Sequence, residues 1–306
     1  MVNPATTPVC PRCGYDQTGA AAAWRESCPV EGRCSECGTG FAWADLFDPS
    51  RADIRWYVEH ARHAYAMIRR TPPTFLRMAA PWVFWSQVPV HSATHPGRLV
   101  RWLLVFAGVC HLGVWLPVSA FLAAGNRFMS PGWRGIKEVL LSASPAQTFV
   151  DLVNGLLWPF YTFTLRGYPG SVDMSIPAML ALPMWVGVAW WLLLTALPTT
   201  RGLARLRPAH FVRALILQAG VLVLAGTVLR VIYAAHEHWF LRWLDVMNPA
   251  VIMGGLHLWS LVWWACAIRV GWRIESWALF VLGHVAVLIS LYGVVVFVML
   301  GFGIRV

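Results

Sequence analysis

Long apolar segments in the last two thirds of the chain are the feature that most constrains its fold. A helix needs about 20 mostly apolar residues to cross the hydrocarbon core of a bilayer, and five segments after residue 98 reach that length. Little sequence between them can build an ordinary soluble core. We therefore expect an all-α integral membrane protein with about five transmembrane helices, at Leu99–Ala124, Met174–Pro198, Ala209–Tyr233, Met247–Trp272 and Trp277–Phe302.

Composition agrees with this expectation. Hydrophobic residues make up 58% of the chain and charged residues only 12%, which is far from the average of soluble domains. The 19 tryptophans suit a chain that meets the membrane interface many times, where indole rings settle. A net charge of +10 would indicate nucleic acid binding in a soluble protein. Here the arginines flank apolar segments, so we expect the lipid bilayer and no nucleic acid as a partner.

Two C-x2-C pairs near the N-terminus predict a metal site. They are Cys10/Cys13 and Cys34/Cys37, each followed by glycine and separated by 20 residues. A C-x2-C turn brings two thiolates together, and two such turns complete a tetrahedron around Zn²⁺. A segment this small needs the metal to fold. We expect a zinc-ribbon head over residues 1–47 with structural Zn²⁺. Such a closed site leaves no open position for a substrate, which argues against an enzyme.

Two other uses of these four cysteines stay open. The same thiolates can hold a rubredoxin-type iron, or they can form disulfides in an oxidising compartment. Cys28 is a fifth thiol that could replace Cys34, but it has no C-x2-C partner, so we expect a spare thiol. The residues available for packing around the metal are few: Tyr15, Trp24, Val30, Phe41 and Trp43.

The segment 48–98 is predicted to be a basic amphipathic linker. Asp48 and Pro49 have the pattern of a helix start, and Pro72-Pro73 is expected to end that helix. Such a helix in front of a membrane domain is expected to lie on the anionic inner leaflet, with packing on its own head as the alternative. Residues 74–90 are apolar but interrupted, so we expect them to be interfacial or re-entrant. The predicted apolar face comprises Ile54, Val58, Ala61, Tyr65 and Ile68.

The distribution of arginine predicts the orientation. Residues 51–101, 201–213 and 269–273 are rich in arginine, and five crossings place all three on one side. The positive-inside rule makes that side cytoplasmic, so the N-terminus is expected inside and the C-terminus outside. Reducing cytoplasm also keeps cysteine thiols free for zinc. The remaining domain, 99–306, would then carry a long outer loop at 125–173. We expect a helix that begins at Ser144-Pro145 and lies on the outer surface, with a lid over a cavity as the alternative.

Polar residues within the apolar segments are functional candidates by default. Two facing histidines in the first and fourth segments could bind haem or metal or relay protons. The simpler interpretation is a neutral imidazole bonded to a backbone carbonyl, and for the arginine a side chain that reaches the outer interface. His236-Glu237-His238 is a further possible metal site, and Gly254-Gly255 is expected to allow close helix packing. The intramembrane candidates are His111, His257, His284 and Arg230.

Two resemblances to known families add to these expectations. The sequence Cys10-x2-Cys13-Gly14-Tyr15-Asp16, followed by Cys34-x2-Cys37-Gly38, resembles a zinc ribbon found at the N-terminus of uncharacterised bacterial membrane proteins. The remainder is similar in topology to the Yip1-type membrane domain, through the stretch Arg70–Phe75, the arginine-rich loop before Phe211 and the segment from Trp259 to Arg269. These resemblances imply the bacterial cytoplasmic membrane and a role in membrane organisation, without catalytic residues.

Three functions are consistent with these features. The first is a non-enzymatic membrane protein whose cytoplasmic ribbon acts as an interaction or anchoring module for a protein partner. The second is a transporter or channel component with the intramembrane histidines and arginine along a polar path. The third is a haem or redox membrane protein.

Overall fold

The computed structural model describes residues 7–25, 27–115, 117, 176–196, 205–237, 249–274 and 276–301. The predicted outer loop at 125–173 lies outside these residues, as does His238. Contacts divide the chain into two compact units. The first comprises residues 1–102, 186–218 and 259–292, and it contains the metal-binding head. The second comprises residues 103–185, 219–258 and 293–306.

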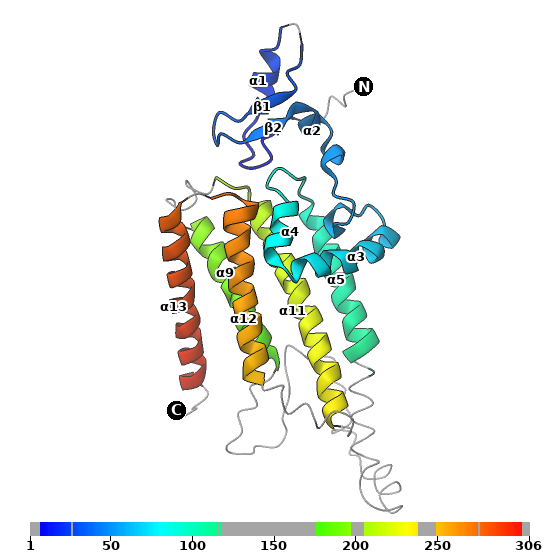
Figure 1. Cartoon of the computed structure of the whole chain (residues 1–306), viewed down its shortest axis with the longest axis vertical. Coiled ribbons are helices and arrows are strands. Elements are labelled where there is room, and N and C mark those ends of the chain that lie inside the picture. Colours follow the sequence, from blue (N-terminus) through cyan, green and yellow to red (C-terminus); the bar gives the residue numbers. More distant parts are fainter. Residues whose placement is uncertain are drawn as a thin grey trace, which may run out of the picture. The chain divides into compact units, whose positions relative to one another are not determined.

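The described chain is mainly helical, with one small sheet in the head (Figure 1). The head contains helix α1 (Thr18–Ala22), strands β1 (Glu31–Arg33) and β2 (Gly40–Ala42), and helix α2 (Trp43–Phe47). The two strands pair antiparallel with Gly32 opposite Phe41. Glycine is required at this position because an added Cβ would lie 2.6 Å from the Phe41 ring.

Aromatic rings and the cysteines form the core of the head. Trp43 is buried, and its ring meets Trp24 edge-on at 4.7 Å and Phe41 at 5.1 Å. The expected contributions of Tyr15 and Val30 are wrong, since these side chains are 46% and 82% exposed. Helix α2 takes their place by supplying Leu46 and Phe47 from beyond the second cysteine pair.

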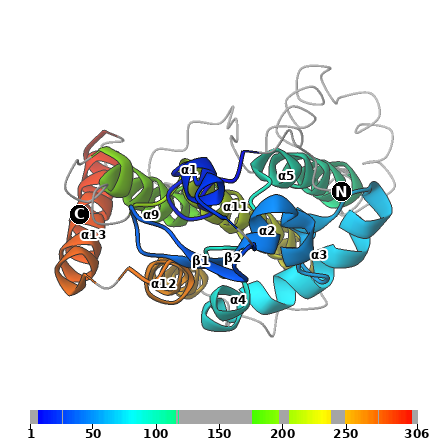
Figure 2. The same cartoon turned by 90° about the horizontal axis from the view of Figure 1, so that it is seen from above.

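The helix of the linker neither begins at Asp48-Pro49 nor ends at Pro72-Pro73, the two positions that the sequence predicts. Asp48 does cap a helical turn with proline in first position, but this turn is only the 3₁₀ segment Pro49–Ala52. A second 3₁₀ turn follows at Val58–His60, and the long helix α3 covers Ala64–Met78. Helix α3 ends there, and the seven-residue helix α4 (Pro81–Gln87) follows. Helix α4 follows α3 at an angle, and the two helices contact each other (Figure 1, Figure 2). Residues 74–90 therefore form no continuous spanning helix, as expected.

Helix α3 also runs through Pro72 and Pro73, where the sequence predicts its end. Each proline removes a backbone donor from the helix. The Thr71 and Thr74 hydroxyls beside them donate to the Met67 and Arg70 carbonyls at 2.8 Å and 2.7 Å, and not to the Ile68 and Arg69 carbonyls that the two prolines leave without a helical donor. Thr74 is fully buried and its hydroxyl also accepts the Val58 N–H at 3.1 Å. Tertiary contacts of this kind outweigh the local preference of the proline pair.

One face of α3 remains unpacked. Tyr65, Ile68 and Leu76 are 70%, 70% and 75% exposed, and their spacing places them on one side of the helix. The opposite side packs inward through Thr74 and Met78. The predicted apolar face therefore exists from Tyr65 onward, but Val58 and Ala61 belong to the buried turn before the helix.

Five helices occupy the five predicted apolar segments. They are α5 (Pro96–Cys110, continued by a π-helical turn at His111–Trp115), α9 (Ile176–Ala196), α11 (Pro208–Glu237), α12 (Pro249–Cys266, continued by a π-helical turn at Ala267–Gly271) and α13 (Trp277–Gly301). Within the described residues, two segments are long and apolar enough to cross a membrane, Pro96–Val114 and Pro208–Leu229. Pro183–Thr195 and Phe280–Ser290 are apolar but shorter. Five crossings remain a prediction.

Close helix packing depends on glycines other than the predicted pair. A Cβ at Gly187 would overlap Gln218 Oε1, and one at Gly271 would lie 2.6 Å from the Trp85 ring. Gly254 and Gly255 are different, because no described atom from outside their own helix lies within 4 Å of a Cβ built there. The predicted packing role of that pair is not found.

The glycine of α13 gives a test of this packing. A Cβ at Gly283 would overlap the Trp190 ring and lie 3.0 Å from Leu193. We expect Gly283→Ala to destabilise the protein by about 1–3 kcal/mol through overpacking. The matched change Gly254→Ala should be neutral or stabilising by up to about 1 kcal/mol, because alanine favours helix. Thermal unfolding in detergent measures both, and equal effects would contradict this packing.

Candidate metal centre and a buried ion pair

Both C-x2-C segments fold into the same turn. In the first, the Gly14 N–H donates to the Cys10 carbonyl at 2.9 Å; in the second, the Gly38 N–H donates to the Cys34 carbonyl, also at 2.9 Å. Both glycines have positive φ, +81° and +70°, which side chains disfavour. The two turns are therefore equivalent loops, each presenting two thiols on one side.

The four predicted thiols converge. The Sγ atoms of Cys10, Cys13, Cys34 and Cys37 all lie within 4.8 Å of one another. Two of the separations, Cys10 to Cys37 and Cys13 to Cys34, are 3.6 Å. Tetrahedral Zn²⁺ with Zn–S bonds of about 2.3 Å requires S···S distances of about 3.8 Å. The donor set and its spacing thus fit a single metal ion. The predicted convergence of these four cysteines is confirmed, and zinc stays a prediction.

Polar groups surround the thiols. Gln17 is buried and its Nε2 donates to Cys34 Sγ at 3.4 Å, while Cys37 Sγ lies 3.3 Å from the Thr39 hydroxyl. Such outer contacts orient metal ligands. Cys28 is exposed, and its thiol contacts only the neighbouring Pro29 carbonyl among the described residues. It is the spare thiol that the sequence predicts.

Burial and hydrogen bonds together set the protonation of the metal-free thiols. It raises the pKa of Cys10 to about 11 and that of Cys13 well above its ordinary value. Burial acts in the same direction on Cys37, but hydrogen bonds with Thr39 and with the neighbouring thiols outweigh it and lower its pKa to about 7. Metal binding must therefore release protons from at least two thiols at neutral pH.

The first turn is bonded to the start of α11. The Arg207 N–H donates to the Arg12 carbonyl at 2.8 Å, and His210 Nε2 lies 2.9 Å from the Pro11 carbonyl, to which it must donate. The Arg207 stem passes 3.4 Å from where a Cβ of Gly14 would lie. The head is thus fixed to the helix through the backbone between its first two cysteines.

A buried ion pair lies at the same end of α11. Arg213 Nε is 2.6 Å from Glu59 Oε2, and these side chains are only 1% and 0% exposed. The other Glu59 oxygen accepts the His95 N–H at 2.5 Å. Arg213 donates to the Ser92 hydroxyl at 3.0 Å and to the Ala93 carbonyl at 2.5 Å. One charge pair therefore joins the linker, the 92–95 loop and α11.

Neighbouring side chains complete this cluster. His60 Nδ1 accepts the Ile54 N–H at 2.6 Å, so its Nε2 must carry the proton donated to the Ala93 carbonyl at 3.0 Å. Burial lowers the His60 pKa, which favours this neutral form. Burial, with Glu59 next, raises the pKa of the fully buried Tyr57 hydroxyl. In this cluster the ion pair of Arg213 and Glu59 is flanked by the neutral side chains of His60 and Tyr57.

This ion pair is not predicted from the sequence. Helical spacing would place Glu59 on the polar face of the predicted linker helix. Arg213 is used only as one of the arginines whose distribution predicts the orientation. Two signals were nevertheless present. Glu59 is one of only 14 acidic residues in the chain, and Arg213 lies within a long apolar helix, where an unpaired charge is costly.

Among the candidates predicted within the apolar segments, His284 lies in the first unit. His284 Nδ1 lies 2.8 Å from the Phe280 carbonyl and its ring packs on Trp190 at 4.8 Å. This arrangement agrees with the simpler interpretation of the sequence, in which the imidazole is bonded to a backbone carbonyl. His111 and His257 belong to the second unit and are half-buried. The side chains of Arg230 and of residues 236–238 are outside the described ones, so those candidates stay predictions.

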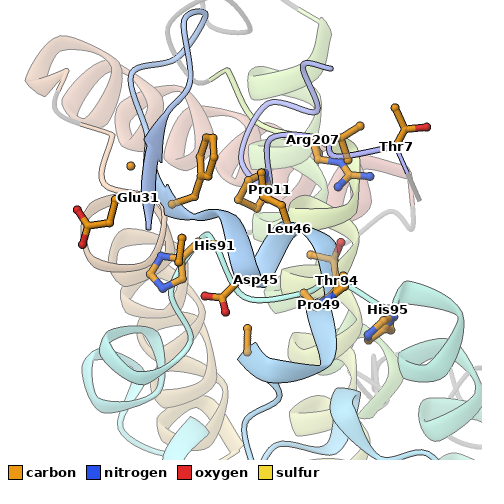
Figure 3. Close-up of a pocket in the computed structure, with 16 residues that line it drawn as sticks. Thr7, Pro11, Glu31, Asp45, Leu46, Pro49, His91, Thr94, His95 and Arg207 are labelled. Carbon is orange, nitrogen blue, oxygen red and sulfur yellow. The ribbon is translucent and has the colours of Figure 1, made fainter. Parts of the chain in front are cut away.

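A cavity of about 550 Å³ opens beside the head (Figure 3). Its walls come from the head, the linker, the 91–95 loop and the residue before α11, and its polar residues include Glu31, Asp45, His91, His95 and Arg207. Burial lowers the pKa of both histidines, with Arg273 adding to the effect at His91 and Arg98 at His95. Both imidazoles are therefore neutral at pH 7.

Comparisons with protein-family models, curated proteins and solved structures gave no match for this chain.

Proposed function

We propose that this chain is a non-enzymatic multi-pass protein of the bacterial cytoplasmic membrane, whose zinc-loaded ribbon binds a protein partner in the cytoplasm. The closed four-thiolate site carries this proposal, because it offers a metal no open position for substrate. One side of the ribbon is bonded to α11, while Tyr15 and Val30 are exposed. The membrane-organising role implied by the Yip1-type resemblance belongs to the same proposal.

The outer face of α3 supports contact with the membrane surface. Tyr65, Ile68 and Leu76 expose apolar area on a helix that contains arginines and no acidic residue. Apolar residues beside arginine suit the boundary between lipid tails and anionic headgroups. Five crossings, with the N-terminus inside and the C-terminus outside, complete the proposed topology.

The exposed thiol of Cys28 tests the topology directly. In intact cells, a membrane-impermeant maleimide should leave Cys28 unlabelled, and should label it after permeabilisation. A Val306→Cys substitution in a Cys28→Ser background should be labelled without permeabilisation. Labelling of both positions from the same side would refute the proposed five crossings. The Cys28→Ser protein alone controls for reaction at the other cysteines.

A photo-cross-linking residue at Val30 tests the proposed binding role. We expect one discrete adduct with a cytoplasmic protein in membranes, and its loss when Cys34→Ser removes a metal ligand. The same residue placed at Val109, which is exposed on α5, should not give that adduct. Absence of any adduct from Val30 and from a second exposed position, Tyr15, would contradict the role.

A further inference from the structure

The cavity beside the head has the size of a small-molecule site. Its volume of about 550 Å³ lies within the range of sites that enclose small ligands. Its lining combines apolar residues, such as Val9, Phe41 and Leu46, with a few charged groups. No role described so far accounts for this cavity, whether that of the metal site, the ion pair or the proposed partner surface.

Arg207 provides a fixed cationic group in this cavity. Its backbone is held by the hydrogen bond to Arg12, and its stem lies against Gly14. In the described part of the chain, no carboxylate forms an ion pair with its guanidinium. A positioned guanidinium without an acidic partner is suited to bind an oxyanion, above all a phosphate.

Figure 3 shows that further donors lie on the same side of the cavity as Arg207. The hydroxyl of Thr94 and the ring of His95 are found there. A neutral imidazole and a hydroxyl can each donate one hydrogen bond. Together with the guanidinium they match a group with several acceptor oxygens.

Carboxylates occupy the other side. Glu31 and Asp45 lie there, with the ring of His91 next to them (Figure 3). Asp45 pairs with Arg51, whose Nε is 3.9 Å away, and the arginine and aspartate side chains are 63% and 40% exposed. Such an exposed pair is weak, so Asp45 remains able to bind a ligand cation.

From this separation of charge we propose that the cavity binds a small zwitterion of the phosphoethanolamine type, with its phosphate at Arg207 and its ammonium group at Asp45 and Glu31. A lipid headgroup and a free metabolite share this chemistry. The inference goes beyond the proposed function and does not depend on the identity of the ribbon's partner.

Titration of the purified, metal-loaded full chain tests the proposal. The probe is glycerophosphoethanolamine, with glycerol 3-phosphate and ethanolamine as its two halves. We expect the zwitterion to bind at least about tenfold more tightly than either half, a factor that corresponds to about 1.4 kcal/mol. Arg207→Gln should weaken binding of the zwitterion and of glycerol 3-phosphate. Asp45→Asn should weaken binding of the zwitterion and leave that of glycerol 3-phosphate unchanged.

Arg25→Gln is the matched control, because Arg25 is an exposed arginine of the head outside the cavity. It should leave all three affinities unchanged. Metal content and thermal unfolding verify that each variant is folded, and Asp45→Asn keeps the test valid if Arg207→Gln does not fold. No saturable binding of the zwitterion, or equal affinity for the zwitterion in wild type and Asp45→Asn, would overturn the proposal.

Lipid extraction separates the two sources of the ligand. Phosphatidylethanolamine that remains with the purified protein, and is lost in Arg207→Gln, would identify a headgroup. Binding of the soluble probe with no retained phosphatidylethanolamine would identify a free metabolite. Both results support the shared chemistry.

Discussion

Arg213→Met is expected to destabilise the protein by about 3–5 kcal/mol, because it leaves the Glu59 carboxylate buried without its partner. Both side chains are almost completely enclosed, so water cannot replace the lost charge. The substitution also removes the donors to Ser92 and Ala93. Denaturant unfolding of the purified protein, followed by tryptophan fluorescence, measures the loss.

Two further variants isolate the charge effect. Replacing both partners, Glu59→Leu with Arg213→Met, should recover part of the stability, because no uncompensated charge then remains. Arg62→Met is the matched control, since Arg62 pairs with Asp53 at 3.1 Å but is 61% exposed. It should change stability by less than about 1 kcal/mol. A double variant as unstable as Arg213→Met alone would argue against a buried ion pair.

Metal removal is expected to unfold the whole head. Structural zinc in small domains contributes about 10–16 kcal/mol, and the aromatic core around Trp43 is too small to replace it. Amide hydrogen exchange should show that the N–H groups of Gly14 and Gly38 lose protection after chelation. The Arg207 N–H should lose protection as well, because its acceptor is the Arg12 carbonyl.

Cysteine variants separate metal loss from damage by the chelator. Cys34→Ser should reproduce the exchange pattern of the chelated protein, since it removes one of four ligands. Cys28→Ser should leave protection unchanged, because its thiol is exposed and outside the site. Retained protection at Gly14 and Gly38 after complete metal removal would show that the head folds without metal.

The metal site could be predicted well from the sequence because its determinants are local. A C-x2-C turn brings its two thiols together with little help from the rest of the chain. The helical segments were also predictable, since each is a long apolar run with proline or polar residues at its ends. Ile176–Ala196, for example, lies within the predicted Met174–Pro198.

Features that depend on contacts between distant residues were not predictable. Helix α3 continues through Pro72 and Pro73 because it is held by tertiary contacts, such as those of the buried Thr74, whose hydroxyl accepts the Val58 N–H. No local rule pairs Glu59 with Arg213 across 154 positions of sequence. Likewise, the required glycines are those that face a large side chain, such as Gly283 against Trp190, and not an adjacent pair such as Gly254-Gly255.

Metal content of the purified full-length protein tests the four-thiolate centre most directly. We expect one zinc ion per chain in protein extracted with detergent, loss of that ion in Cys13→Ser, and full retention in Cys28→Ser. Folded protein that carries no metal, or that keeps its metal when Cys13 is replaced, would contradict the proposed role of the ribbon.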